Sequence, residues 1–495
     1  MNSSLRFQQQ RLRAKLRQQV SLVARILQIT RISLKFLFLV FVADPIRRRL
    51  TKSGAPTRPV RLRQFFESIG GSFLKLGQMM ALQPDLIPVE YCDGLMDLMD
   101  RIPPFDYETA ERIFQEESGK KLLDVFERVE TTQLATASIG QVYVAYLNGR
   151  KVAIKLQRPE AESLVTSDVR VSSFLVRIIK TLSVKPLYWM LEPLSEFIRW
   201  SREELDFQYE GRYTQQALEN SRGEAFEKVP KVYWEWTSRR ALVIEFLEGI
   251  TVIDYLRKRN DQEVDQSSIL PEGYCSGDFC NHIVENFLGG AFNCGLFHAD
   301  LHPGNLMIME NSMVGYIDFG ITGILSDYSR TNLIGLTLAY AQGDIDQMLK
   351  SFTRVSTITS GSDLNKLELG LRRRAEVWYK KESGKSTSIT SMMLDWLNLS
   401  KESEVWPQRD VIKYIRCSVV MDGLIKRLDP DFDIGAALAT AARQHLEAGV
   451  RRNLFSYERV FEAFSNSNDL VCGGPSTLRT AVTNLAQAMD LPVKP

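Results

Sequence analysis

The stretch from Leu296 to Gly320 constrains this chain more than any other, because acidic and amide residues at fixed intervals interrupt an apolar sequence. Asp300 is followed five positions later by Asn305, and an apolar run then leads to Asp318-Phe319-Gly320. A Pro-Gly pair between the first two residues favours a turn. We therefore expect a loop, a strand and a second loop that bring these polar side chains together.

This spacing is typical of the catalytic centre of a protein kinase. Transfer of a γ-phosphoryl group needs magnesium ions beside the triphosphate and a carboxylate directed at the attacking hydroxyl or water. We expect Asn305 and Asp318 to hold magnesium and contact ATP, and Asp300 to orient the nucleophile, with His298 as a further catalytic residue. The alternative is a solvated helix-to-strand turn, which is the poorer explanation because two spaced motifs agree and a third supports them.

A hairpin upstream supplies the third motif. Gly140 to Leu147 and Arg150 to Leu156 are strand-like runs around Asn148-Gly149, a strong signal for a tight turn. The second run contains Val152-Ala153-Ile154-Lys155, which matches the kinase strand whose lysine contacts the α- and β-phosphates. An inward lysine needs an anionic partner because an unpaired buried charge is costly. The alternative is an outward, solvated lysine.

The loop before this hairpin departs from the kinase pattern. Where G-x-G-x-x-G would let bare backbone approach the phosphates, residues 134–142 are rich in alanine and contain a single glycine. Added methyl groups restrict left-handed backbone conformations and close approach to a ligand. We therefore expect an altered phosphate cradle, with candidate contacts at Ala135, Ala137, Ser138, Gly140 and Val142.

Several motifs in this order resemble the UbiB family of atypical protein-kinase-like proteins. They are K-x-G-Q at Lys75 to Gln78, the alanine-rich loop, the VAIK strand, E-x-D at Glu204 to Asp206, and HADLHPGN at His298 to Asn305. Alone, the K-x-G-Q tetrapeptide would indicate only surface residues around a helix glycine. The resemblance covers about residues 65 to 325, and the family's C-terminal helices extend it towards residue 450.

The resemblance implies roles that spacing alone does not give. It implies that the K-x-G-Q helices fold over the active site, where a peptide substrate would otherwise bind. It also implies that Lys75 and Gln78 face the nucleotide and that Glu204 and Asp206 interact with Lys75.

The resemblance further implies that Glu210 is the helix glutamate that pairs with Lys155. Asp206 and Glu210 are four residues apart, so one helix from about Pro193 to Asn220 would place both on one face. The alternative is a solvated acidic helix face, because neighbouring glutamates compete for the same pairing.

Val243 to Gly249 begins as an apolar strand and resembles the hinge that holds adenine, which makes Glu245 and Leu247 candidate contacts. The usual His-Arg-Asp is His298-Ala299-Asp300 here, so the arginine that pairs with a phosphorylated activation loop is absent. No A-P-E sequence follows the Asp-Phe-Gly motif. We therefore expect no control by activation-loop phosphorylation.

Positive charge is concentrated at the N-terminal end. Residues 1–66 hold 15 lysines or arginines and one acidic residue, although the net charge of the chain is only +2. Residues 20–43 are strongly apolar, but three basic residues interrupt them, and a spanning helix needs about 20 continuous apolar residues. We expect residues 1–60 to contact a membrane surface. An acid-poor transit peptide and a helix packed on its own domain are the alternatives.

The residues that accompany this charge are aliphatic rather than stacking aromatics, so we expect no nucleic-acid partner. Six cysteines without a C-x-x-C pair or zinc spacing favour a reducing, intracellular compartment. We expect the protein at the cytoplasmic face of a membrane, or in an organelle after removal of a transit peptide.

We predict a bilobal, protein-kinase-like α/β (α+β) fold with helical N-terminal and C-terminal extensions. The predicted divisions are a basic amphipathic segment (1–60), a helical K-x-G-Q extension (61–121), a smaller lobe with inserted helices whose first strand is at 125–134 (122–250), a larger lobe with helical extension (251–450), and a tail (451–495).

The expected activity is binding and hydrolysis of ATP with magnesium, with phosphoryl transfer left open. Analogy with the family implies support of isoprenoid-quinone biosynthesis, of the ubiquinone type, or of membrane lipid metabolism. The expected partners are a lipid or quinone precursor and a membrane-enzyme complex. A nucleotide-binding pseudokinase scaffold and a small-molecule phosphotransferase of the aminoglycoside-kinase type are the alternatives. The oligomeric state stays open, with a homodimer as one option.

Overall fold

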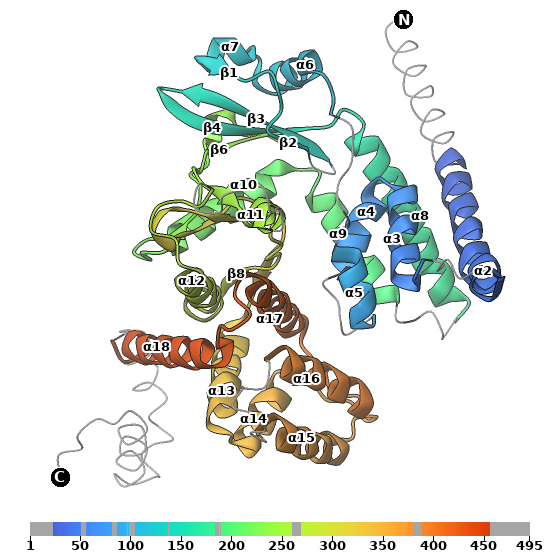
Figure 1. Cartoon of the computed structure of the whole chain (residues 1–495), viewed down its shortest axis with the longest axis vertical. Coiled ribbons are helices and arrows are strands. Elements are labelled where there is room, and N and C mark those ends of the chain that lie inside the picture. The colour runs from blue at the N-terminus through green and yellow to red at the C-terminus, as the bar shows by residue number, and fades with distance from the viewer. Residues whose placement is uncertain are drawn as a thin grey trace, which may run out of the picture.

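The computed structural model describes residues 23–50, 56–81, 87–96, 98, 104–136, 139–183, 188, 190–259, 269–379 and 389–455. They form two lobes with a separate group of helices beside them (Figure 1). Both ends of the predicted division, residues 1–22 and most of the C-terminal tail, lie outside the described residues. The predicted bilobal α/β fold with helical extensions is confirmed.

The smaller lobe is built on a five-stranded antiparallel sheet. Its order is β1 (Arg128–Val129), β3 (Gly140–Leu147), β4 (Arg150–Gln157) and β6 (Ala241–Glu245), and β2 (Ala135–Thr136) pairs with β3. The predicted turn is confirmed, because Asn148 and Gly149 both have positive φ, 51° and 70°. This left-handed conformation matches the twist of the flanking strands.

Helices cover both faces of this sheet. α6 (Tyr107–Ser118) and α7 (Leu122–Val125) pack on one face, where Phe114 and Tyr143 belong to one buried core. α10 (Phe207–Asn220) packs on the other face, with Phe207 and Leu242 in a second core. The sheet therefore holds α10 rigidly against β4.

The helical group beside the lobes joins the N-terminal segment to an insertion between β4 and β6. It contains the helix Val23–Arg47, which runs into α2 (Asp44–Leu50), and then α3 (Arg58–Ile69), α4 (Ser72–Ala81), α5 (Val89–Met96), α8 (Ala161–Thr181) and α9 (Leu191–Glu203). Phe73 of α4 stacks on Phe197 of α9, with ring centroids 5.6 Å apart. This packing fixes the position of α4, which carries the K-x-G-Q motif.

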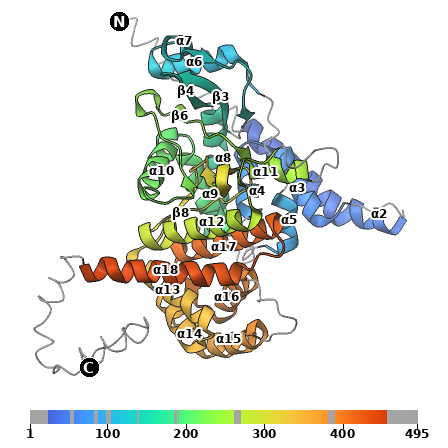
Figure 2. The same ribbon diagram turned by 60° about the vertical axis from the view of Figure 1, so that its left-hand side comes forward.

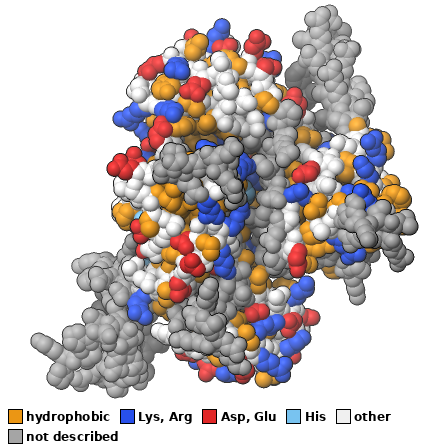
Figure 3. All heavy atoms as spheres, in the orientation of Figure 1, with side chains coloured by type: hydrophobic (Ala, Val, Ile, Leu, Met, Phe, Trp, Pro, Cys, Tyr) orange, Lys and Arg blue, Asp and Glu red, His pale blue; other side chains and the backbone are white. Residues whose placement is uncertain are grey.

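The helix Val23–Arg47 is apolar on its solvent side. Its mean hydropathy reaches 1.9, so its length and composition alone would allow it to cross a membrane. Ile29 and Ile32 pack on the helical group, whereas Leu34 and Phe41 are exposed. Figure 3 shows hydrophobic and basic side chains together at this outer edge of the molecule. The helix therefore packs on the chain itself, one of the predicted alternatives, and also exposes an apolar face to solvent.

The larger lobe places the catalytic-type motif on two short pairs of antiparallel strands. α12 (Ser276–Gly289) and a π-helical turn (Gly290–Cys294) lead into β8 (Leu296–His298), β9 (Leu306–Ile308), β10 (Val314–Tyr316) and β11 (Thr322–Ile324). β5 (Glu227–Lys228) and β7 (Ile250–Thr251), which precedes α11 (Val252–Arg259), complete the sheet of β9 and β10. Asp300 and Asn305 lie between β8 and β9, and Asp318 lies between β10 and β11.

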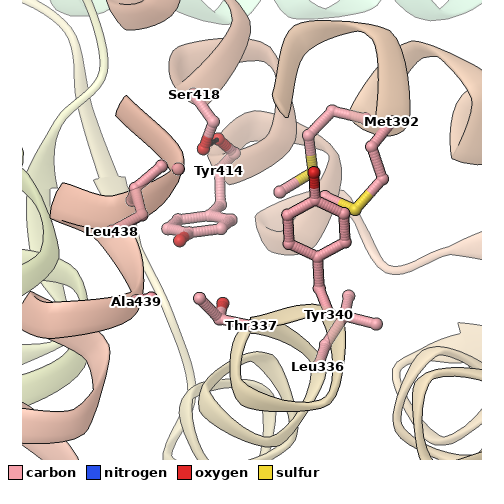
Figure 4. Close-up of a pocket in the computed structure, with 10 residues that line it drawn as sticks. Leu336, Thr337, Tyr340, Met392, Tyr414, Ser418, Leu438 and Ala439 are labelled. Carbon is pink, nitrogen blue, oxygen red and sulfur yellow. Dashed lines mark hydrogen bonds between the residues drawn. The ribbon is translucent and has the colours of Figure 1, made fainter. Parts of the chain in front are cut away.

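The chain continues into α13 (Asp327–Gln342), α14 (Ile345–Arg354), α15 (Leu364–Tyr379), α16 (Ile389–Ser403), α17 (Arg409–Leu428) and α18 (Ile434–Phe455), with β12 (Ser356–Thr357) paired to β13 (Trp406–Pro407). α18 crosses the larger lobe beside α12 and α13 (Figure 2). A cavity of about 20 Å³ remains among these helices, next to Tyr340, Met392 and Tyr414 (Figure 4). It holds about one water-sized probe, so this extension is closely packed.

Two predicted elements are wrong. Residues 125–134 do not form one strand, because α7 ends at Val125 and β1 contains two residues only. The predicted helix over residues 193–220 is divided into α9 and α10. Asp206 causes this break, because its side chain accepts a hydrogen bond of 3.0 Å from the Gln208 amide and caps α10.

Candidate nucleotide and magnesium site

Three elements bring together one lysine and two carboxylates between the lobes. Lys155 of β4 donates to both carboxylate oxygens of Glu210, each at 2.8 Å, and to Oδ2 of Asp318 at 3.2 Å. Glu210 is on α10, and Asp318 lies between β10 and β11. The pairing of Lys155 with Glu210 agrees with the expectation, and the inward lysine has the anionic partners that its burial requires.

The charges of this cluster shift its pKa values. Burial alone would lower the pKa of Lys155, but Asp318 and Glu210 outweigh burial and raise it above its ordinary value. Burial raises the pKa of Glu210 to about 7, against the attraction of Lys155. Lys155 and Lys75 overcome the effect of burial on Asp318 and hold its pKa far below the ordinary value. Asp318 therefore stays ionised at all physiological pH values, as a magnesium ligand must be.

Asp300 and Asn305 are joined within one loop. Nδ2 of Asn305 donates to the backbone oxygen of Asp300 at 3.1 Å and to its Oδ2 at 3.0 Å. The carbonyl oxygen of the Asn305 side chain accepts no hydrogen bond within the described chain. An oxygen of this kind is a suitable ligand for magnesium.

His298 lies behind this loop rather than at its surface. It is buried, its Nε2 lies 2.6 Å from the backbone oxygen of Asp318, and its Nδ1 accepts from the Asp300 amide at 3.2 Å. Burial lowers the pKa of His298, so the ring is neutral and donates through Nε2. Both ring nitrogens are occupied by backbone groups, so any catalytic role would be exercised through the positions of Asp300 and Asp318.

The K-x-G-Q and E-x-D residues meet only in part. Nζ of Lys75 lies 3.6 Å from Oε1 of Glu204, as expected. Asp206 caps α10 and forms no ion pair within the described residues, so its predicted interaction with Lys75 is not present. Gln78 directs its amide nitrogen to the Leu98 backbone oxygen at 3.3 Å. The lysine is thus directed towards the cluster, whereas the Gln78 amide helps to hold α4 in place.

The alanine-rich loop is partly described. Ala135 is exposed on β2, and Ala137 and Ser138 lie outside the described residues. Val142 is opposite Lys155 in the β3–β4 pair. A Cβ at Gly140 would lie 3.1 Å from the Leu156 backbone oxygen and 3.3 Å from the ring of Phe207, so this glycine is required for close packing of β3.

The hinge candidates differ from each other. The carboxylate of Glu245 accepts from Nζ of Lys228 at 2.8 Å and from the Lys231 amide at 3.1 Å, so this side chain is already engaged by residues 228–231, outside the hinge. Leu247 is buried, and its amide donates no hydrogen bond within the described chain. The Leu247 amide is therefore the better candidate for contact with a nucleotide base.

A further ion pair, which positions α4, was not predicted from the sequence. Nε of Arg25 lies 2.7 Å from Oδ1 of Asp168, and the guanidinium also donates to the Ile69 and Gly70 backbone oxygens. Oδ2 of Asp168 accepts from the amide of Ser72, the first residue of α4. The only available signal was a buried aspartate among the apolar residues of α8.

Comparison with known proteins agrees with this geometry. The ABC1 atypical kinase-like domain family matches residues 97–352, more than half of the chain. An Arabidopsis thaliana protein named "ACTIVITY OF BC1 COMPLEX KINASE 1, chloroplastic" is 31% identical over 383 residues, which are 76% of this chain and 54% of that protein. A "Probable protein kinase UbiB" from Pseudomonas fluorescens (strain Pf0-1) is 28% identical over 76% of this chain and 70% of its own length.

A solved Mycobacterium tuberculosis protein in complex with erythromycin is 20% identical, with a TM-score of 0.48 over 77% of this chain and 96% of that one. This chain spans about half of the chloroplastic relative, 54% of its length. The family match covers the VAIK strand, the E-x-D motif and both loops of the lysine–carboxylate cluster. The chain therefore belongs to the ABC1 atypical kinase-like family of the UbiB type, and it is a kinase-like phosphotransferase or ATPase.

Proposed function

We propose that this protein binds magnesium-ATP between its lobes and hydrolyses it, in support of isoprenoid-quinone biosynthesis or membrane lipid metabolism. The observation that carries the proposal is the contact of Lys155 with both Glu210 and Asp318. A lysine held between these two carboxylates is the arrangement that an active kinase site needs. The relatives named UbiB support the choice of quinone metabolism as the process served.

The residues fit magnesium. Asp318 is ionised, and its Oδ1 is oriented by the Gly320 amide at 2.7 Å. Asn305 supplies a carbonyl oxygen, and carboxylate and amide oxygens are the ligands that magnesium prefers. Two protein ligands suffice here because nucleotide phosphates and water complete the magnesium coordination in such sites. When bound, the ion would neutralise charge that develops on the phosphates.

The protein's own residues would carry the remaining roles. Lys155 would bind the α- and β-phosphates, and Glu210 would keep its ammonium in place. Asp300 would orient the attacking hydroxyl or water, and one hydrogen bond from Asn305 positions its carboxylate. His298 would hold the two acidic loops in register through their backbone.

Lys75 supports hydrolysis, or transfer to a small or lipid acceptor, over phosphorylation of peptides. Its ammonium is close enough to lower the pKa of Asp318, and it also forms an ion pair with Glu204 at 3.6 Å. The packing of α4 against α8 and α9 would keep this lysine over the site. A peptide would then have to displace a packed helix.

The exposed apolar face of the helix Val23–Arg47 supports work at a membrane surface. Arg31 and Lys35 are exposed beside Leu34, a combination that attracts anionic lipid. The proposed location is therefore peripheral to a membrane, where a lipid or quinone precursor and membrane-bound enzymes would be the partners.

Turnover measurements test the proposal. The purified protein would be assayed for ATP hydrolysis with and without anionic liposomes, a quinone-precursor lipid and a generic peptide substrate. We expect hydrolysis that liposomes or the lipid increase, and no peptide phosphorylation at ordinary kinase rates. Nucleotide binding without turnover in any condition would instead support a scaffold, and rapid peptide phosphorylation would contradict the covered site.

A further inference from the structure

A second cavity lies beside the catalytic loops. It has a volume of about 110 Å³ and lies between the C-terminal ends of α10 and α12 and the two strand pairs of the larger lobe. His298 and Phe319 form part of its wall, whereas Lys155, Asp300 and Asp318 do not line it. The cavity is therefore distinct from the proposed nucleotide site but shares one wall with its supporting residues.

Glu227 of β5 is a half-buried acid that lines this cavity. Within the described chain its carboxyl group forms no hydrogen bond and no ion pair. Burial, together with the nearby Glu224, raises the pKa of Glu227 to about 8. Tyr316 of β10 lies near this acid, because burial and then the charge of Glu227 raise the pKa of the tyrosine, but no hydrogen bond joins the two side chains within the described chain. A partly buried carboxyl group without a partner is costly, so a ligand that pairs with Glu227 would gain binding free energy.

The rest of the lining favours a positive ligand with an apolar body. Glu224 and Glu285 also line the cavity, and Arg222 is its one lysine or arginine. Phe287 and Phe297 supply aromatic rings, which attract organic cations as well as apolar groups. In the part of the chain that the structure describes, no three acidic, histidine or cysteine side chains lie close enough to hold a metal ion. An organic cation therefore fits better than a metal.

We propose that this cavity binds a small organic ammonium compound, with its cationic group at Glu227 and its apolar body against Phe287 and Phe297. The size of the cavity sets the size of the ligand, because an engineered cavity of about 150 Å³ admits one benzene molecule. This cavity is somewhat smaller, at about 110 Å³, so a short alkyl chain fits as it stands and a single ring fits once neighbouring side chains shift.

A ligand in this cavity would contact residues that position Asp318 in the proposed nucleotide site. His298 forms part of the cavity wall, and its Nε2 lies 2.6 Å from the Asp318 backbone oxygen. The ring of Phe319, also in the wall, lies 5.1 Å from the His298 ring. A ligand that packs on these two rings contacts the residues that hold Asp318, so the cavity is placed to influence the metal-binding loop.

Proton release gives this proposal a specific signature. With the cavity empty, Glu227 is mostly protonated near neutral pH, since its pKa is about 8. Glu224 from the same segment, Glu285 of α12 and Arg222 also line the cavity, and of these Glu224 favours the protonated form. An ammonium group that pairs with Glu227 would displace its proton into the solvent. Binding should therefore release close to one proton per ligand.

Calorimetry on the full chain without nucleotide tests the proposal, and it does so independently of any ATPase activity. The probe is benzylammonium, and its neutral counterpart is benzyl alcohol, each titrated in two buffers of different ionisation enthalpy. We expect saturable binding of benzylammonium with proton release, and binding of benzyl alcohol that is weaker by about tenfold or more. Glu227→Gln should weaken benzylammonium by about tenfold and abolish the proton release. Glu376→Gln, an exposed acid on α15, is the matched control and should change neither.

Two cysteines in the same chain provide a second readout. Cys294 lines the cavity, and Cys275 precedes the opposite end of α12; both are exposed. Bound benzylammonium should slow alkylation of Cys294 by iodoacetamide about fivefold or more, because the ligand occupies the cavity that this thiol lines. Alkylation of Cys275 should be unchanged. Ala217→Leu, which fills the cavity from α10, should abolish the protection in a protein with an ordinary melting curve.

Three results would contradict binding of an organic ammonium compound in this cavity. Absence of saturable binding for benzylammonium, cyclohexylammonium and butylammonium alike would overturn it. Equal affinity of Glu227→Gln and the unmodified protein, or equal protection of both cysteines, would do the same. Loss of ATP turnover alone would leave these results unchanged, so failure of the proposed nucleotide function is distinguishable.

Discussion

The ammonium of Lys155 lies 3.2 Å from the carboxylate of Asp318, although 163 positions separate the two residues in the chain. Only the closure of the two lobes onto each other can produce this contact. Glu210 of α10 accepts hydrogen bonds from the same ammonium. Lys155 therefore links the sheet of the smaller lobe, α10 and the loop that contains Asp318.

Replacing Glu210 should make nucleotide binding weaker and insensitive to pH. The pKa of Glu210 is raised to about 7, so its carboxylate loses charge, and its hold on Lys155, as the pH falls below that value. Magnesium-ATP affinity of the unmodified protein should therefore fall between about pH 8 and about pH 6. Glu210→Gln should bind about tenfold more weakly at pH 8, with little pH dependence. Fluorescent-nucleotide titration measures both, with Glu376→Gln as control, and an equal pH response in the two proteins would refute the role of Glu210.

Glu227 should make the fold less stable as the pH rises. Its pKa is about 8 in the folded protein against 4.5 for an ordinary glutamate, so the folded state binds this proton more tightly than the unfolded chain. The stabilisation is therefore present at low pH and lost from about pH 4.5 to about pH 8. Glu227→Gln should melt at a higher temperature than the unmodified protein near pH 8 and at a similar one near pH 5. A difference that instead grows towards low pH would have the wrong sign.

The Arg25–Asp168 pair should stabilise the helical group. Arg25→Met leaves the fully buried Asp168 without its cation, which costs about 3 kcal/mol in comparable buried pairs. Arg31→Met changes an exposed arginine of the same helix and should have little effect. Thermal unfolding of the two variants makes the comparison. Similar melting temperatures would show that the pair contributes little.

Gly71 should be essential beside this pair. Its φ is +62°, and an added Cβ would lie 2.8 Å from Nη2 of Arg25 and 2.9 Å from Oδ2 of Asp168. Gly71→Ala should therefore cost about 2 kcal/mol or more, since it adds steric conflict to backbone strain. Gly119→Ala is the matched control, because its φ is +74° and nothing lies within 4 Å of its added Cβ. Equal destabilisation of the two variants would exclude the predicted contact.

The exposed face of the N-terminal helix should bind anionic lipid. Replacing Leu34, Phe38 and Phe41 with serine removes the apolar surface and should lower liposome binding about tenfold or more. Val377→Ser, at an equally exposed apolar site of α15, should have no effect. Co-sedimentation with anionic vesicles measures the fraction bound. Unchanged binding of the triple variant would leave the membrane proposal without its surface.

The site residues that could be predicted best from the sequence are those whose chemical role few other residue types can fill. Lys155, Asp300, Asn305 and Asp318 were identifiable because phosphate and magnesium chemistry dictates both their types and their spacing. Glu210 required family resemblance, since several glutamates precede α10. The carboxyl groups of that segment could be distinguished only by the fold.

Other features of the site depend on contacts between distant parts of the chain, which a local sequence pattern does not predict. Asp206 was expected to face Lys75, but the chain ends one helix and begins the next at this point, and its side chain is used as a cap. The link between Arg25 and Asp168 spans 143 positions. The cavity around Glu227 is formed by segments that meet only after the larger lobe has folded.

The most direct test of the account is the affinity of magnesium-ATP for Asp318→Asn, measured beside the unmodified protein. The substitution keeps the size of the side chain and removes the charge that would bind the metal and attract Lys155. We predict that affinity falls at least about tenfold in the presence of magnesium, with a normal melting curve. Unchanged affinity in a folded protein would contradict the assignment of this site to a nucleotide and its metal.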